Sequence, residues 1–381
     1  YKNQWDYISK YRRVIDFFDA VKIGLTATPA LHTKDIFGET VFQYSYRQAV
    51  LDGYLVDHEP PHIIQTKLSK EGIKWKEGEK VEYFDPNEAD IKQLELLEDD
   101  LNFDISDFNK KVLTPNFNKV IIDYLAQNID PDSNEKTLIF AVNNFHADMI
   151  VNLLKERFTA IDDNAVMKIT AETDKVKEQI KRFKNERLPN IVVTVDLLTT
   201  GIDVPEICKL VFMRRVSSRI LYEQMIGRAT RKCDKINKDH FEIYDAVGIY
   251  EILKPYTQMK PIVQNPKTDI SKLIDELSNI KNKNQQRVQI DAIIAKLQRK
   301  RYKARDEHEE KFRTKTRGNN ISSFINDFKN MNLEEQLKFV KQNKDIFEFF
   351  DEIKPLKEKQ YISNHEDKLD SVKRDFNSKD A

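Results

Sequence analysis

Short apolar runs alternate with amphipathic stretches between residues 118 and 250, and this alternation is the strongest constraint on the fold. Five apolar runs predict strands, at residues 137–142, 166–170, 191–195, 209–213 and 241–245. Helical patterns lie beside and between them, at residues 120–127, 146–158, 173–185 and 220–231. Runs that are apolar throughout are typical of strands buried on both faces of a parallel sheet. The sequence therefore predicts an α/β fold, a doubly wound parallel sheet covered by helices.

The residues before this region predict the end of another α/β unit. Two apolar runs predict strands and one short stretch predicts a helix, at residues 21–28, 41–45 and 47–52. Gly53 is the expected end of that helix, because glycine readily adopts the conformation that closes a helix. Pro60 and Pro61 favour extended backbone over residues 58–66.

The composition then changes twice along the chain. Residues 67–107 are charged, poor in β-branched residues and acidic towards their end, so they predict a linker or surface insertion rather than a binding tail. After residue 255 the strand patterns stop, and apolar residues recur at helical spacing through residues 272–303 and in three shorter stretches up to residue 353. We expect four segments: the end of a first domain (1–66), an acidic linker or insertion (67–112), a complete second domain (113–250) and a helical region (251–381).

Composition excludes some kinds of partner. Lysine plus arginine equals aspartate plus glutamate, 63 of each, so any nucleic-acid surface must be a local patch. The sequence lacks the run of about eighteen apolar residues that a membrane-spanning helix needs, and its first ten residues lack a signal peptide. Cys208 and Cys233 have no metal-ligand spacing. These features predict a cytoplasmic protein without bound metal or membrane contact.

Residues 224–231, Gln-Met-Ile-Gly-Arg-Ala-Thr-Arg, place two arginines three positions apart in a predicted helix. Arg228 and Arg231 would share one face of that helix, and Gly227 would let it approach another surface closely. Guanidinium groups stay charged and bind phosphate oxygens in a forked geometry, so the pair suits a γ-phosphate whose charge builds during transfer. The alternative is a solvated helix face with two surface arginines.

Residues 193–205 form the second candidate segment, at the end of a predicted strand where α/β sheets bind ligands. Its small hydroxylated residues and its glycine offer hydroxyls and backbone amides to phosphate groups. These phosphates could belong to a nucleotide or to a nucleic acid, and Asp203 is placed to meet a cation or a nucleotide hydroxyl. A simple turn followed by a helix cap is the alternative.

These segments, together with Thr26-Ala27-Thr28-Pro29, resemble the motifs of superfamily 2 helicases and translocases. The matches are motif III at residues 26–29, motif IV at 138–143, motif V at 193–205 and motif VI at 224–231. The resemblance implies a RecA-like sheet in the second domain, which is entire, and in the first, which is present only in part. It also implies that Thr26 and Thr28 couple the two motor domains. By the same resemblance we expect nucleic-acid contacts from four residues of the 193–205 segment: Thr194, Asp196, Thr199 and Thr200. The expected nucleotide contacts are Gly201, Asp203, Gln224, Arg228 and Arg231.

The flanking residues narrow the resemblance. Residues 37–38, 44–56, 109–115 and 241–247 are similar to the HsdR subunits of type I restriction enzymes, in the branch with an EcoEI-type C-terminal region. This implies a parent protein that uses ATP and Mg²⁺ to translocate double-stranded DNA and cuts it in a complex with methylase and specificity subunits. The Gly-x-x-x-x-Gly-Lys-Ser/Thr and Asp-Glu-x-His motifs are absent. We therefore expect this chain alone to be inactive and to bind no cofactor tightly.

A basic stretch lies between residues 296 and 317, with ten lysines and arginines against four acidic residues and with Tyr302 and Phe312 among them. Arg299, Lys300 and Arg301 are its most concentrated part. The stretch could follow a DNA backbone, dock on a partner subunit, or form a solvated helix.

The predicted function is therefore that of a fragment from the DNA-translocating endonuclease subunit of a type I restriction system. Another superfamily 2 helicase acting on DNA or RNA is one alternative. The other is a non-catalytic module that binds DNA or a subunit.

Overall fold

The computed structural model describes residues 13–26, 36–84, 92–159, 162–196, 203–216, 218–353 and 371–374. Within these ranges every helix is too short or too polar to cross a lipid bilayer.

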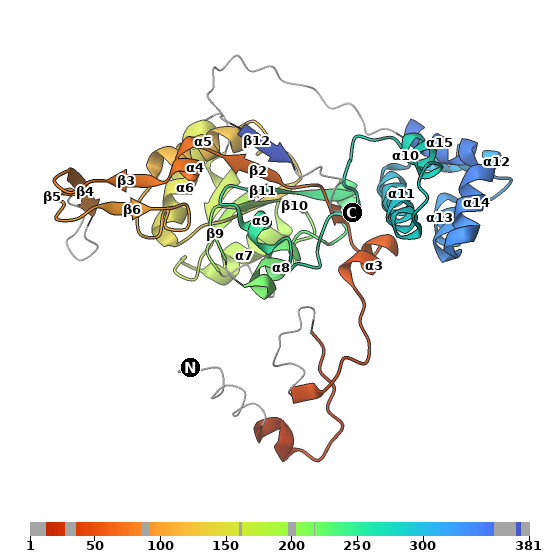
Figure 1. Cartoon of the computed structure of the whole chain (residues 1–381), viewed down its shortest axis with the longest axis horizontal. Helices are drawn as coiled ribbons and strands as arrows, with labels where there is room; N and C mark the ends of the chain where they lie inside the picture. The colour runs from red at the N-terminus through yellow and green to blue at the C-terminus, as the bar shows by residue number, and fades with distance from the viewer. Residues whose placement is uncertain are drawn as a thin grey trace.

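A single large sheet forms the centre of the protein (Figure 1). Its strands run in the order β12-β2-β11-β10-β7-β9-β8, and β1 pairs with β11 outside this path. Their bounds are β1 Asp57–His58, β2 His62–Gln65, β7 Lys136–Phe140, β8 Val166–Lys168, β9 Ile191–Thr194, β10 Ile207–Phe212, β11 His240–Asp245 and β12 Ser371–Arg374. All pairs are parallel except β12 with β2. The five predicted strands all lie in this sheet, so the α/β fold class is confirmed.

Two layers of helices cover the sheet, one on each face. Alternate side chains of each strand pack against opposite layers. Ile139 of β7 packs in the cluster that includes α5 Pro115–Ala126 and α6 Asn144–Arg157. Its neighbours Leu138 and Phe140 pack in the opposite cluster, with α7 Val176–Asn185, α8 Arg219–Ile226 and α9 Ile249–Leu253. All three strand side chains are fully buried. Burial on both faces explains why residues 138–140 of β7 form a continuous apolar run.

The acidic stretch predicted as a linker or insertion folds as an antiparallel ribbon that projects from the sheet (Figure 1). After the short helix α4 Lys67–Glu71, its strands are β3 Ile73–Trp75, β4 Lys80–Phe84, β5 Lys92–Leu96 and β6 Leu101–Phe103. β3 pairs with β6 and β4 with β5. The sequence did not predict these strands because the stretch lacks the apolar run that marks a strand buried on both faces.

The two strands predicted near the N-terminus are wrong within the described residues. Residues 21–26 pair with no described strand, and Val21 and Leu25 are 91% and 95% exposed. Residues 41–45 also form no strand, and the side chain of Val41 is fully exposed. A strand needs a neighbour to take its backbone hydrogen bonds and an apolar surface to cover its side chains, and neither lies beside these segments.

The connector, residues 46–57, joins this segment to the sheet. The predicted helix is present as α3 Tyr46–Leu51, and Gly53 follows it at a φ of +73°. Beyond the connector, the stretch predicted to be extended contributes β1 and β2, which pair with β11. The predicted domain boundary at residue 66 therefore does not follow the sheet, because β1 and β2 belong to the same sheet as the five predicted strands.

The C-terminal region is helical, as predicted. Its helices are α10 Ile270–Leu277, α11 Lys283–Lys303, α12 Asp306–Lys315, α13 Ile321–Asn330, α14 Leu333–Gln342 and α15 Lys344–Glu352. The predicted helical stretch of residues 272–303 is two helices, and α12 was not predicted as a helix. Phenylalanines form much of the core, including Phe312, Phe324, Phe328, Phe347 and Phe350. The chain then returns to the sheet as β12, a strand that the sequence did not predict.

Candidate functional site

The arginine loop, residues 227–231, follows α8 and carries the two predicted catalytic arginines. The helix ends at Ile226, and the hydroxyl of Thr230 donates to the carbonyl of Gly227 at 3.1 Å. Arg231 then forms an antiparallel bridge with Leu55. The expectation that both arginines lie on one helix face is therefore wrong: the chain leaves the helix before Arg228, because the loop bonds to itself and to the connector.

The structure nevertheless brings Arg228, Arg231 and Asp203 together. Arg231 forms an ion pair with Asp203, and both side chains are 48% exposed. Arg228 is half-buried, and burial together with the charge of Arg231 lowers its pKa, which Asp203 partly offsets. Two guanidinium groups thus lie in one loop, and Arg231 pairs with the carboxylate of Asp203. Gln224 lies one turn earlier on α8 and is half-buried.

The residues predicted to contact nucleic acid at the end of β9 divide into two kinds. Thr194 is fully buried inside the sheet, so its side chain cannot reach a ligand at the surface. Asp196 lies beyond the strand, is exposed, and pairs with Arg214 at 2.6 Å. Arg214, which follows β10 and also donates to the carbonyl of Val195 at 3.2 Å, was not predicted. Thr199, Thr200 and Gly201 lie outside the described residues.

Of the two predicted coupling residues of the first domain, the structure describes only Thr26, which is not in a strand. Thr26 is exposed in the irregular segment before the connector, and Thr28 lies outside the described residues.

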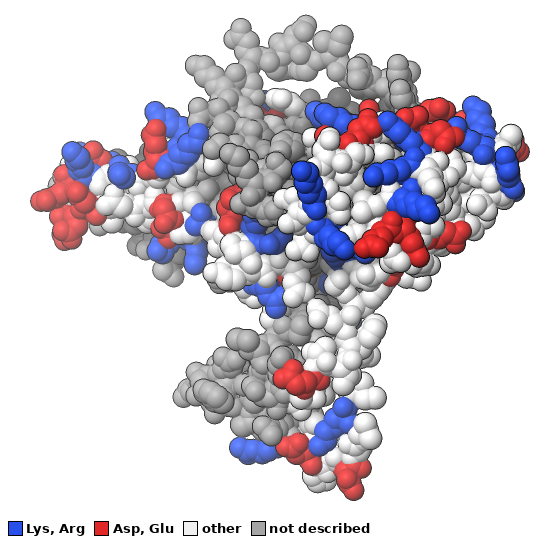
Figure 2. Space-filling view, turned by 45° about the vertical axis from the view of Figure 1, so that its right-hand side comes forward, with Lys and Arg blue, Asp and Glu red and all other residues white. Residues whose placement is uncertain are grey.

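Arg299, Lys300 and Arg301 all make contacts within the protein, and Arg299 is not available as a surface for DNA. Arg299 is buried and pairs with Asp57 at 3.2 Å and Glu59 at 3.7 Å. The ammonium of Lys300 donates to the carbonyl of Ile353 at 2.7 Å. These cations therefore join α11 to the sheet and to the end of α15, and Arg299 is unavailable to a phosphate. Figure 2 shows lysines and arginines interspersed with acidic residues over this part of the molecule.

Arg301 has a third kind of contact. Its guanidinium lies 5.0 Å from the ring centroid of Tyr302 and donates to that hydroxyl at 3.3 Å. The exposed cations of the stretch lie further along, from the N-cap of α12 to just beyond its end, namely Arg305, Lys311, Arg313, Lys315 and Arg317.

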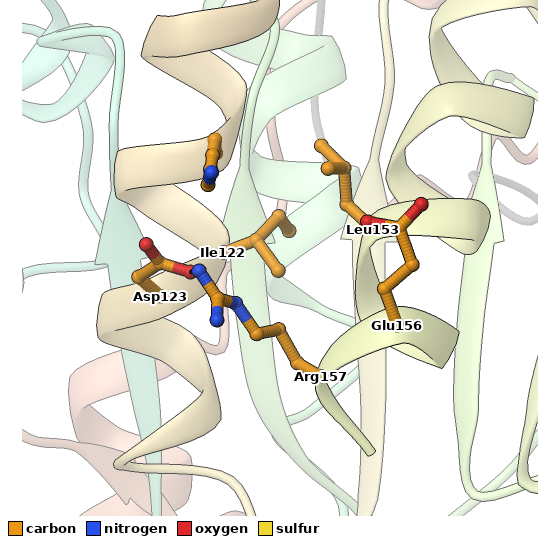
Figure 3. A pocket seen from close by; sticks show the side chains of 6 residues that line it. Ile122, Asp123, Leu153, Glu156 and Arg157 are labelled. Carbon is orange, nitrogen blue, oxygen red and sulfur yellow. Dashed lines mark ion pairs between the residues drawn. The ribbon is translucent and has the colours of Figure 1, made fainter. Parts of the chain in front are cut away.

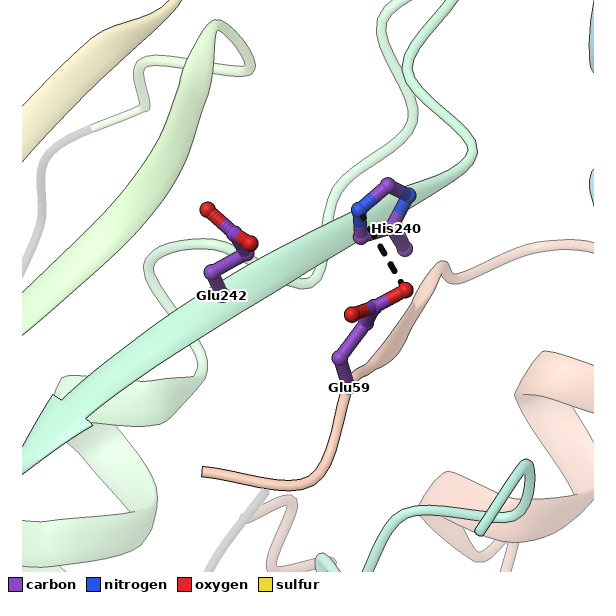
Figure 4. A group of neighbouring side chains, drawn as sticks. All are labelled: Glu59, His240 and Glu242. Atoms are coloured by element: carbon purple, nitrogen blue, oxygen red, sulfur yellow. Dashed lines mark ion pairs between the residues drawn. The ribbon is translucent and has the colours of Figure 1, made fainter. Parts of the chain in front are cut away.

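Glu59, His240 and Glu242 form the one group among the described residues with the composition of a metal site, with ligand atoms within 4.8 Å of one another (Figure 4). Cations already neutralise it: Arg299 lies 3.7 Å from Glu59, and Lys209 lies 3.8 Å from Glu242. Although burial alone would raise it, the pKa of Glu242 is lowered to about 2 by the hydrogen bond from His62, the charge of Lys209 and the Tyr244 hydroxyl. A divalent cation would have to displace these partners, so the group fits an ion-pair network better than a metal site.

A small recess lies between α5 and α6 and is lined by Lys119, Ile122, Asp123, Leu153, Glu156 and Arg157 (Figure 3). An ion pair between Arg157 and Asp123 crosses it. Both helices cover the face of the sheet opposite α8, so this recess is separate from the arginine loop.

Known proteins resemble this chain over most of its length. Residues 118–233, which include the arginine loop, match the helicase conserved C-terminal domain. The EcoKI endonuclease subunit of a type I restriction enzyme from Escherichia coli K12 is 49% identical over 287 residues, 73% of this chain and 24% of that protein. The EcoAI endonuclease subunit from Escherichia coli is 28% identical over 296 residues, 71% of this chain and 34% of that protein. This chain thus spans between a quarter and a third of the length of these relatives.

A solved structure also aligns with it: a fragment described as an HsdR subunit of a type I restriction enzyme from Vibrio vulnificus YJ016. The two are 24% identical with a TM-score of 0.48, over 66% of this chain and 45% of that one. The resemblance inferred from the motifs is confirmed by the sequence relatives: the chain is homologous to the endonuclease subunits of type I restriction enzymes and carries their helicase conserved C-terminal domain.

Proposed function

We propose that the chain is part of the ATP-dependent, DNA-translocating endonuclease subunit of a type I restriction–modification system. In this proposal the sheet and its helices form the second motor domain, which closes onto ATP and Mg²⁺ bound by a first motor domain. Residues before the connector would belong to that first domain, and the exposed apolar side chains of Val21 and Leu25 are consistent with a surface that another part of the protein covers. The homology to the EcoKI subunit supports the assignment.

The observation that carries the proposal is the charge of the arginine loop. Arg228 and Arg231 lie close enough for the charge of one to lower the pKa of the other, while Asp203 supplies one negative charge. Two guanidinium groups close together favour a bound anion beside them. A polyphosphate supplies that anion, and guanidinium groups stabilise the charge that builds on a γ-phosphate during transfer. We therefore assign catalysis to Arg228 and Arg231, with Asp203 and Gln224 beside the nucleotide.

The carboxyl ends of the strands are the proposed DNA side. Asp196 and Arg214 stand at the ends of β9 and β10, where parallel sheets bind ligands. Thr199, Thr200 and Gly201 remain predicted contacts to phosphates in the same segment. Methylase and specificity subunits are the proposed partners, and cutting DNA within the cell requires a cytoplasmic location.

Two preparations test this function: the full-length protein assembled with its methylase and specificity subunits, and the 381-residue chain by itself. We expect the assembly to hydrolyse ATP, to displace a DNA triplex and to cut unmodified plasmid DNA. We expect the chain alone to show no ATP turnover with or without DNA, because it lacks the loop whose backbone amides and lysine bind the β- and γ-phosphates. Strand separation without directional movement along duplex DNA would instead support another class of helicase. DNA-stimulated turnover by the chain alone would contradict the proposed division of the site between two domains.

A further inference from the structure

The connector lies directly against the arginine loop. Leu55 forms an antiparallel bridge with Arg231, and the amide of Val56 donates to the carbonyl of Thr230 at 2.8 Å. The backbone of the loop thus depends on where residues 55 and 56 lie. A displacement of the connector would move Arg231 with it.

Helix α11 of the C-terminal region contacts the other side of the connector. The side-chain amide of Gln298 donates to the backbone carbonyl of Leu51 at 3.1 Å, and the hydroxyl of Tyr302 donates to the carbonyl of Gly53 at 2.9 Å. The approach is close enough that a Cβ on Gly53 would lie 2.9 Å from Oε1 of Gln298. Side chains of α11 therefore determine the path of the connector after α3.

Asp57, at the end of the connector, is held by four hydrogen bonds to its buried carboxylate. Asp57 is 2% exposed, and its carboxylate accepts from Arg299 at 3.2 Å, from the hydroxyl of Tyr46 at 3.2 Å, and from the amides of Ile262 and Val263 at 3.0 Å. A buried carboxylate with four donors has little freedom to move. Among these four donors only Arg299 carries a positive charge, so Arg299 neutralises Asp57. Asp57 lies two residues after Leu55, the residue that bridges to Arg231.

Tyr302 makes a second and independent link. The ammonium of Lys232, the residue after Arg231, lies 4.9 Å from the ring centroid of Tyr302, in the geometry of a cation–π contact. One side chain of α11 therefore touches the chain on both sides of the bridge, at Gly53 and at Lys232.

We propose that Arg299 and Tyr302 are positioning residues that keep the arginine loop, through the connector, where Arg228 and Arg231 reach the nucleotide. The proposal rests on the function proposed above for those arginines. It assigns the helical region a direct role in ATP turnover, because α11 supplies both contacts.

The first test measures hydrogen exchange in the 381-residue chain, over peptides that cover residues 54–57 and 228–232. We expect Arg299→Met to speed hydrogen exchange of these amides about tenfold. Without the bond between Arg299 and Asp57, local opening of the connector costs less free energy. Arg299→Lys should give a smaller effect, since it keeps the charge. Tyr302→Phe is a mild variant that keeps the ring over Lys232 and loses the hydroxyl's bonds to Gly53 and to its neighbour Arg301, so it should speed exchange at residues 54–57 without unfolding the chain.

Arg287→Met is the matched control. Arg287 also lies on α11, but it contacts Gln336 and Asp291 rather than the connector. We expect exchange in both peptides to remain at the wild-type rate in this variant. Equal exchange in Arg299→Met, Tyr302→Phe and wild type would overturn the proposal.

The second test measures ATP turnover by the full-length protein. We expect Arg299→Met and Tyr302→Leu to lower kcat about tenfold at unchanged KM, since a misplaced loop weakens contacts made in the transition state, with partial rescue by Arg299→Lys. Unchanged kcat in both variants, in a protein whose Arg228→Ala variant is inactive, would refute the positioning role. Normal turnover by Arg228→Ala would instead refute the proposed function of the loop itself.

Discussion

Replacing Arg231 with alanine in the full-length protein should abolish ATP turnover with little effect on folding. Its ion pair with Asp203 is half-exposed on both sides, and such pairs contribute about 0–1 kcal/mol to stability. Loss of a guanidinium that meets the γ-phosphate in the transition state costs roughly 10³-fold or more in rate, about 4 kcal/mol. The expected catalytic effect is therefore several times larger than the expected change in the free energy of unfolding.

Arg228→Ala should have the same catalytic effect and a somewhat larger structural one. Arg228 is half-buried, so the substitution also removes packing of its alkyl stem, about 1 kcal/mol. Both variants should retain ATP binding, because these side chains are expected to act on charge that appears only during transfer.

The assay combines steady-state kcat and KM for ATP, in the presence of duplex DNA, with thermal unfolding of each variant. Arg187→Ala is the control: Arg187 is 53% exposed and pairs with Asp132 at 3.7 Å, which matches the kind of ion pair that Arg231 makes but lies on a different loop. We expect it to retain wild-type kcat. A normal kcat in Arg231→Ala, or a raised KM with unchanged kcat, would refute the transition-state role. An unfolded Arg231→Ala protein would show that the pair with Asp203 is structural.

Two further predictions concern stability. The pKa of Glu242 is depressed from 4.5 to about 2, so the stability that its carboxylate contributes is present above pH 4.5 and lost as the pH falls towards 2. In urea unfolding we expect Glu242→Gln to be less stable than wild type by about 2–3 kcal/mol at pH 7 and equally stable near pH 2. The exposed Glu178→Gln is the control, and a difference in stability that does not depend on pH would contradict the prediction. Gly53→Ala should lower the free energy of unfolding by about 2–4 kcal/mol, because it combines a strained positive φ with an overpacked contact to Gln298 and Arg301. The control is Gly78→Ala, at a similar φ but with no atom within 4 Å of its Cβ, which should lose only the part due to backbone strain. Thermal unfolding measures both variants, and equal losses would show that packing at Gly53 is unimportant.

The sequence alone determined the five strands β7 to β11 of the sheet and the helical character of the C-terminal region. The strand at Ile191–Thr194 is apolar at three of its four positions because it is buried on both faces, and few other positions in a fold suit such a run. The amphipathic spacing of α13 likewise follows from one buried face, with Phe324 and Phe328 in the core. The family could also be inferred from the sequence, because the motifs at residues 193–205 and 224–231 are short contiguous segments that can be recognised without the fold.

The exposed and edge elements were not determined in this way. β12 lies at one end of the strand order and the ribbon lies outside the large sheet, so neither carries the continuous apolar run that marks a strand buried on both faces. The end of α8 before Arg228 was also decided by tertiary contacts, because the bridge from Leu55 competes with continuation of the helix.

Only the tertiary structure decided the role of the basic stretch. A local run of lysines and arginines predicts a solvated or DNA-binding surface, because a cation without a nearby acid in sequence normally remains in water. Arg299 is buried because Asp57 lies beside it, 242 residues earlier in the chain. The cost of burying a charge is offset only by a partner in space, and where that partner lies depends on how α11 packs against the sheet.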